Sequence, residues 1–144
     1  MKIDKEKLKN IDKLPADVRR ELALLMNKHD QKTKESKIRS DFLTFVKHVW
    51  PDFIEGRHHK EIADKFNKLA AGKIKRLIIN MPPRHTKSEF GSYLLPAWMV
   101  GKNPKLKIIQ STNTTELSVR FGRKAKALID SPEYQEVFKT RLKE

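Results

Sequence analysis

Residues 76–89 read RLIINMPPRHTKSE, and this stretch decides which fold the sequence predicts. The apolar run at 77–79 is typical of a strand that is covered on both faces. Pro82 and Pro83 then indicate a tight loop. From Ser88 to about Trp98 the sequence is compatible with a helix. A loop between a strand and a helix N-terminus attracts anions, because the first N–H groups of the helix are unpaired and its dipole is positive there.

Phosphate-binding loops often have the pattern G-x-x-x-x-G-K-[ST]. Lys87 and Ser88 match this pattern, whereas Met81 and Thr86 occupy the two glycine positions. The lysine suits the outer phosphates of a nucleotide, and the serine hydroxyl suits a magnesium ion. Because proline has no N–H group, the backbone donors to phosphate should come from the residues after Pro83. The predicted phosphate-binding residues are therefore Arg84, His85, Thr86, Lys87 and Ser88.

The same pattern also fits a strand, a turn and a helix in which Lys-Ser occurs by coincidence. The sequence beyond the loop favours the phosphate-binding interpretation. A turn at 101–104 is followed by a second apolar run at 106–110, and Asn113 with Glu116 resembles a capping box. Residues 74–130 thus predict β–loop–α–β–α with two parallel strands and a right-handed crossover. Ser131-Pro132 should then cap and start a last short helix. The expected fold class is α/β, an incomplete P-loop NTPase-type parallel sheet preceded by helices.

The segments before this unit are predicted to be helical. A helix should begin after Ser40 and end at Trp50-Pro51, and another should run from about His58 to Ala71, with Gly72 just beyond it. Residues 1–13 are predicted to lack structure, a short helix should end near Lys28, and 29–40 should form a polar linker. The predicted division is therefore a charged arm at 1–40 and an ATPase-like part at 41–144.

Charge and composition narrow the choice of partners. The chain has 32 Lys and Arg against 18 Asp and Glu, a formal charge of +14. Such a surplus favours polyanions, although a solvated surface is the simpler alternative. The sequence has no cysteine and no apolar run approaching the ~18 residues that span a bilayer. We therefore expect no membrane partner and a cytoplasmic location.

Other candidate residues have two interpretations each. His58 and His59 are adjacent, so they face different sides of a helix and do not predict a metal site. Contacts at the helix start, or with a nucleotide base, fit them better. Trp50 and Trp98 fit a core or an interface. A basic stripe near one helix predicts either a solvated face or contacts with DNA phosphates; its members are Arg120, Arg123, Lys124 and Lys126.

Residues 41–138 resemble the start of a tailed-bacteriophage large terminase subunit. The most specific part is PPRHTKSE at 82–89, which is similar to the variant Walker A loop of that family, often written with Gly in the place of Thr86. GRHHK at 56–60 resembles the segment near the adenine, and STNTTELSVRFGRK at 111–124 resembles the second strand and its helix.

The resemblance implies an ATPase that drives viral double-stranded DNA into a procapsid in the host cytoplasm. It implies ATP and Mg²⁺ as cofactors, with the portal and the small terminase subunit as partners. Lys87 would hold the β- and γ-phosphates, Ser88 would help to bind the metal, and Arg84 would act as the catalytic arginine near the γ-phosphate. His58 and His59, with Arg57, would lie near the base.

The sequence departs from the family pattern because no Walker B acids and no nuclease acids occur before Glu144. Hydrolysis requires such a carboxylate, so we expect nucleotide binding without turnover until a second chain or the remaining part of the terminase completes the domain. A truncated protein, half of a divided terminase and a short natural remnant all fit, as does self-association. The alternatives in function are a helicase-like ATPase fragment and a non-enzymatic basic module that binds nucleic acid or capsid.

Overall fold

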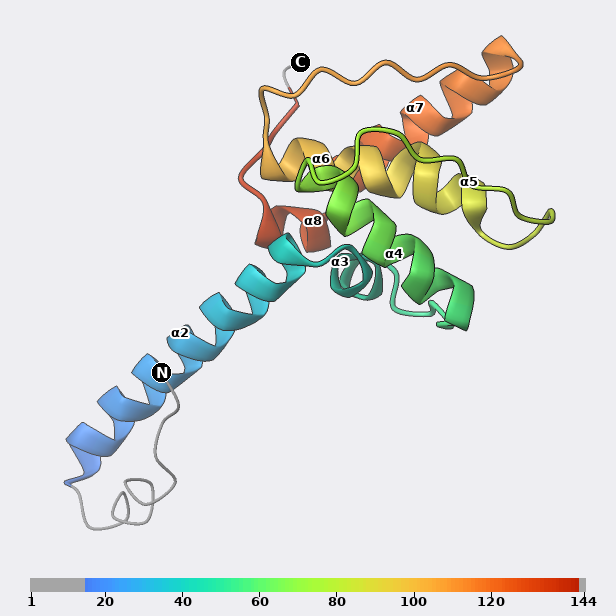
Figure 1. Cartoon of the computed structure of the whole chain (residues 1–144). Coiled ribbons are helices and arrows are strands. Elements are labelled where there is room, and N and C mark those ends of the chain that lie inside the picture. Colours follow the sequence, from blue (N-terminus) through green and yellow to red (C-terminus); the bar gives the residue numbers. More distant parts are fainter. Residues whose placement is uncertain (1–14, 143–144) are drawn as a thin grey trace. The chain divides into compact units, whose positions relative to one another are not determined.

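The computed structural model describes residues 15–142, and this part of the chain is helical (Figure 1). No helix in it is long and apolar enough to cross a membrane. The helices, in chain order, are α2 (Ala16–Ser40), α3 (Phe42–Val49), α4 (Arg57–Ala70), α5 (Lys87–Glu89), the π-helical turn η2 (Phe90–Leu94), α6 (Leu95–Lys102), α7 (Thr115–Ile129) and α8 (Pro132–Val137).

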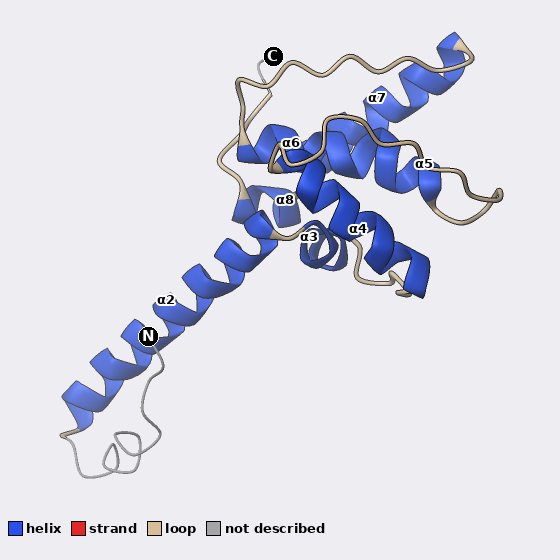
Figure 2. Cartoon of the chain, viewed as in Figure 1, coloured by secondary structure: helices blue, strands red, loops and turns tan. Residues whose placement is uncertain are grey.

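The predicted parallel sheet is wrong. Between residues 15 and 142 the structure has no strand, and both apolar runs lie in loops (Figure 2). In the first apolar segment, residues 77–81, burial alternates: Leu77, Ile79 and Met81 are half-buried against the core, whereas Ile78 is 85% exposed. In the second apolar segment, residues 106–110, Ile109 is 97% exposed.

Neither segment is therefore covered on both faces, which was the premise of the strand prediction. A strand needs neighbours for its N–H and C=O groups, and a pair of strands is at best marginally stable alone. The helices supply an apolar surface for one side of the first segment. Apolar residues of the first segment therefore contact the core, although the segment forms no paired strand.

The chain divides into two compact units, residues 1–34 and 35–144. The prediction for residues 1–13 lies outside the described residues. In the first unit, residues 16–34 are helical and mostly exposed, with Leu24 and Leu25 more than half exposed. The polar linker predicted at 29–40 is wrong, because α2 continues to Ser40. Its Gln, Lys and Glu residues are good helix formers, and Ile38 is buried in the second unit.

The core of the second unit is a cluster of aromatic rings around Phe42 of α3. This ring meets Phe66, Phe90 and Trp98 edge to face, with centroid distances of 5.1, 5.4 and 5.5 Å. Edge-to-face geometry is a favoured arrangement of aromatic pairs and adds to the stabilisation from burial. Residues from α3, α4, η2 and α6 are thereby held in one packed cluster.

Asp41 caps α3 and links it to α4. Its carboxylate accepts hydrogen bonds from the Thr44 N–H group at 2.8 Å and from the Asn67 amide at 2.7 Å. The Asn67 side chain in turn accepts a bond from the Phe42 N–H group at 2.9 Å. The predicted cap was Ser40, one residue earlier. The end of α3 at Val49, just before Trp50-Pro51, agrees with the sequence prediction.

The last helix, α8, packs closely on α6. The Tyr134 hydroxyl donates to the Ala97 carbonyl at 2.9 Å. Gly101 fits beside it because a Cβ atom there would lie 2.6 Å from the Phe138 ring and 2.7 Å from the Tyr134 hydroxyl. The absence of a side chain at Gly101 therefore permits the close approach of α8.

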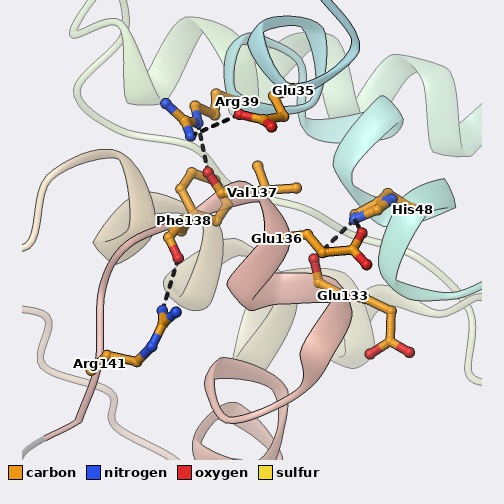
Figure 3. Close-up of polar contacts among 8 residues, drawn as sticks. All are labelled: Glu35, Arg39, His48, Glu133, Glu136, Val137, Phe138 and Arg141. Atoms are coloured by element: carbon orange, nitrogen blue, oxygen red, sulfur yellow. Dashed lines mark hydrogen bonds and ion pairs between the residues drawn. The ribbon is translucent and has the colours of Figure 1, made fainter. Parts of the chain in front are cut away.

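Polar contacts also connect α8 with α2 and α3 (Figure 3). Arg39 donates to the Val137 carbonyl at 2.7 Å and pairs with Glu35 at 3.3 Å. The Nε2 atom of His48 lies 2.9 Å from the Glu133 carbonyl. These contacts join the last turns of α2 to the compact unit, which begins at residue 35.

Residues 87–102 form one continuous helical run, α5–η2–α6, which does not end at Pro96. The widened turn η2 precedes this proline, and the Leu95 N–H group bonds to the Phe90 carbonyl, five residues back. Pro96 lies in the first turn after η2, where its missing N–H group is tolerated. Two other boundaries agree with prediction: Gly72 follows α4 with φ +71°, and Ser131 caps α8.

Candidate functional site

The candidate site is the loop at 82–86 with the start of the helical run α5–η2–α6. The first hydrogen bond of this run is donated by the Phe90 N–H group to the Thr86 carbonyl at 2.9 Å. The N–H groups of Lys87, Ser88 and Glu89 therefore have no partner within the helix. The side chains of Arg84, His85, Lys87 and Ser88 are exposed. A basic loop thus precedes unpaired helical donors, the arrangement that binds anions.

The backbone of the loop is left-handed at two residues, Arg84 with φ +64° and Thr86 with φ +56°. Positive φ is uncommon outside glycine and is an outlier for a β-branched residue. Thr86 stands at the second glycine position of the phosphate-loop pattern. The loop therefore adopts, without glycine, a backbone conformation that glycine ordinarily supplies.

Lys87 folds back over the loop. Its Nζ atom donates to the Met81 carbonyl at 3.3 Å. The residue before the loop and the residue after it are thereby joined across the intervening turn. The ammonium group remains exposed, so it can exchange this single long bond for an anionic partner.

His59, at the start of α4, is joined to the loop. Its Nδ1 atom accepts from the Gly56 N–H group at 2.8 Å, and its Nε2 atom lies 2.6 Å from the Thr86 hydroxyl. That hydroxyl donates to the His85 carbonyl at 2.7 Å. The His59 side chain is 6% exposed and lies against Phe90, with a ring-centroid distance of 5.1 Å.

Burial lowers the pKa of His59 below its ordinary value of 6.5, and the nearby positive charge of protonated His58 lowers it further. The neutral ring is therefore favoured at neutral pH. Since Nδ1 accepts a hydrogen bond, the proton of the neutral ring is on Nε2.

His58 and His85 extend this cluster by ring contacts. The His58 centroid lies 3.8 Å from that of His59 and 5.6 Å from that of His85. The Nε2 atom of His58 is buried without a hydrogen-bond partner among the described residues. The side chain of Arg57, by contrast, is 94% exposed and pairs with Glu61 at 3.7 Å. The structure thus brings both predicted histidines to the loop and leaves the arginine in solvent.

The sequence analysis also did not predict a contact between the helix start and α7. Lys124 of α7 donates to both carboxylate oxygens of Glu89, each at 2.9 Å, and lies 5.2 Å from the centre of the Tyr93 ring. Burial, together with the Glu89 charge, raises the pKa of Tyr93 to about 12. Lys124 was predicted as a member of the basic stripe. Nothing in the sequence pairs two residues 35 positions apart, so only the fold could reveal this link.

In the described part of the chain, no group of three or more acidic or histidine side chains is arranged to hold a metal ion. Ser88 remains the predicted metal-binding residue, with an exposed hydroxyl at the helix start. One serine hydroxyl is a weak ligand by itself, so a magnesium ion here would depend on the phosphate oxygens that it accompanies.

No protein family model matches this chain, and no curated protein or solved structure matches it significantly.

Proposed function

We propose that the loop at 82–88 binds the phosphates of ATP with Mg²⁺, and that the chain is the N-terminal segment of a terminase large subunit that packages viral double-stranded DNA in the host cytoplasm. The observation that carries this proposal is the left-handed Thr86 directly before Lys87 and Ser88 at a helix start. This arrangement gives the variant loop the backbone conformation for which phosphate loops use glycine.

Each part of the loop has a task in this proposal. The N–H groups at the helix start donate to phosphate oxygens, as helix N-termini do for anions. Lys87 leaves the Met81 carbonyl and pairs with the outer phosphates, which are the stronger acceptors because they are charged. Ser88 would help to hold the magnesium ion. Arg84 is exposed in the same loop and meets the γ-phosphate.

This proposal does not require a sheet. The groups that would touch phosphate all lie in the loop and the first helical turn, and the helical core supports them through Phe90, which is fully buried. Phosphate binding by such a loop depends on local backbone geometry and charge. The absence of a strand before the loop therefore changes the scaffold but leaves the proposed contacts in place.

Double-stranded DNA is the polyanion in this proposal. The chain carries a net charge of +14, and Arg120, Arg123 and Lys126 are exposed on α7. Each lysine or arginine that neutralises a phosphate steepens the salt dependence of DNA binding. Replacing these three residues with alanine should reduce the slope of log affinity against log salt, measured with a labelled duplex. An unchanged slope would exclude α7 from the DNA contact.

ATP binding is tested by calorimetric titration of the chain with ATP and Mg²⁺. We expect Lys87→Ala to weaken binding by about tenfold or more, because a charge-assisted contact is lost. Lys107→Ala is the matched control, since Lys107 is also exposed but lies away from the loop in sequence. Equal affinities of the parent chain and Lys87→Ala would reject the proposal and favour a basic module that binds nucleic acid without nucleotide.

A further inference from the structure

We infer that His59 is a positioning residue of the phosphate loop, whose Nε2–H group holds the Thr86 hydroxyl and thereby keeps Thr86 in the left-handed backbone conformation. The inference rests on the proposed function of the loop, since it explains how a loop without glycine adopts the binding conformation. The hydrogen bonds that support it are formed within the chain and require no ligand.

Thr86 needs such a support because its φ of +56° is unfavourable for a β-branched residue. A backbone conformation of this kind persists only where surrounding contacts enforce it. The Thr86 side chain has contacts on both sides: its hydroxyl accepts from His59 and donates to the His85 carbonyl. Both bonds are short, at 2.6 and 2.7 Å.

The direction of the hydrogen bonds follows from the first of them. The Gly56 N–H group can only donate, so the Nδ1 atom of His59 accepts, and the proton of the neutral ring is on Nε2. The Nε2–H group then donates to the Thr86 oxygen, which leaves the threonine proton for the His85 carbonyl. Every donor in this series has an acceptor, so the network is fully satisfied.

The His59 ring is also held in place by packing. Its centroid lies 4.8 Å from that of Phe53 and 5.1 Å from that of Phe90, and the side chain is buried. The aromatic core thereby sets the position of the ring, and the ring sets the position of Thr86. Since both ring nitrogens bond within the chain, His59 supports the loop instead of contacting the nucleotide base.

Two conservative substitutions distinguish the roles of the two ring nitrogens of His59. The amide nitrogen of Gln reaches about as far as Nε2, so His59→Gln can still donate to Thr86. The amide oxygen of Asn takes the place of Nδ1, so His59→Asn keeps the Gly56 contact but loses the one to Thr86. We expect His59→Asn to weaken the affinity for ATP and Mg²⁺ by about tenfold and His59→Gln by less than about threefold.

The test is completed by making His59→Asn also in a chain that carries Thr86→Gly, which gives a double-mutant cycle. Glycine adopts positive φ without support, so His59→Asn should change the affinity by less than about threefold in this background. The same cycle is measured without nucleotide, by urea unfolding. There, His59→Asn should lower the unfolding midpoint more in the parent chain than in the Thr86→Gly background.

The two readouts distinguish the two hypotheses. Coupled unfolding in a chain that binds no ATP would reject the proposed function and support the positioning role of His59. Equal effects of His59→Asn in both backgrounds, in unfolding as well as in binding, would overturn the inference. Equal losses for His59→Asn and His59→Gln would overturn it too, because the Nε2–H contact would then contribute nothing.

Discussion

The aromatic core and the two apolar loop segments contain residues of similar hydrophobicity in opposite surroundings. Phe42, Phe90 and Trp98 are completely buried, whereas Ile78 and Ile109 are 85% and 97% exposed. The core residues belong to helices, which satisfy their own backbone hydrogen bonds and can pack on any apolar neighbour. A strand also needs a partner for its backbone. The comparison shows that apolar residues are completely buried here in helices, where the backbone hydrogen bonds are satisfied within the element itself.

The strongest test of this comparison replaces Phe42, which meets three aromatic rings edge to face. Phe42→Ala should lower the free energy of unfolding by about 3 to 5 kcal/mol, because it removes a large buried side chain and leaves a cavity. Urea denaturation followed by circular dichroism measures the change. Ile109→Ala is the control and should alter stability by less than about 0.5 kcal/mol. Similar losses for both variants would contradict the described difference in burial.

A second test enlarges a residue where α6 meets α8. Gly101→Ala places a Cβ atom 2.6 Å from the Phe138 ring and 2.7 Å from the Tyr134 hydroxyl, so these side chains must shift. We expect a loss of about 1 to 3 kcal/mol in the free energy of unfolding. Gly122→Ala is the matched control, because no atom lies within 4 Å of its added Cβ. That variant should be neutral or slightly stabilising, since alanine is the better helix former.

A third test sharpens the comparison within the first apolar segment. Ile79 is half-buried against the core and its neighbour Ile78 is exposed. Ile79→Ala should cost about 1 to 2 kcal/mol of stability, less than a fully buried position would. Ile78→Ala should stay within about 0.5 kcal/mol. Equal effects in thermal unfolding would show that the segment does not pack on one side only.

The smallest expected effect concerns His59, which links the aromatic core to the loop at 82–86. Burial lowers the pKa of this histidine, and protonated His58 and His85 lower it further, while Glu55 acts in the opposite direction. The folded protein therefore binds a proton less readily than the unfolded chain, which titrates near 6.5. The contribution of neutral His59 to the free energy of unfolding is therefore fully present above the ordinary pKa of 6.5. It is lost as the pH falls toward the lowered pKa of the folded protein.

Unfolding measured between about pH 5 and 7.5 should show this decline. The non-titrating variant His59→Gln should have a flatter dependence over the same range. An identical pH dependence of both proteins would show that another group is responsible. The variant is a suitable control because its side chain is neutral throughout and can still bond to Thr86.

Local signals in the sequence were sufficient for most helices of the second unit. Pro51 after Trp50 predicted the end of α3, Gly72 the end of α4, and Ser131-Pro132 the start of α8. Each of these residues acts through its own backbone preference, so no knowledge of the fold is required. The start of α7 differed by one residue, with Thr114 as the cap in place of Asn113.

Sequence alone was insufficient for the sheet and for the geometry of the loop. The apolar runs at 77–79 and 106–110 fit strands, yet strand formation depends on partners that no local pattern reveals. The loop pattern identified Lys87 and Ser88 but treated Thr86 as a departure from glycine. Only the structure shows that its backbone is left-handed and that His59, 27 residues earlier, bonds to its hydroxyl.

The sequence by itself determined the ends of α3 and α4, the start of α8, the positive charge and the residue types at the loop, because these depend on composition and on local backbone preferences. The tertiary structure decided three features: the absence of strands in residues 15–142, the pairing of Glu89 with Lys124, and the support of Thr86 by His59. The physical reason is the same for all three. Each depends on contacts between residues far apart in the chain, which exist only after the helices have packed.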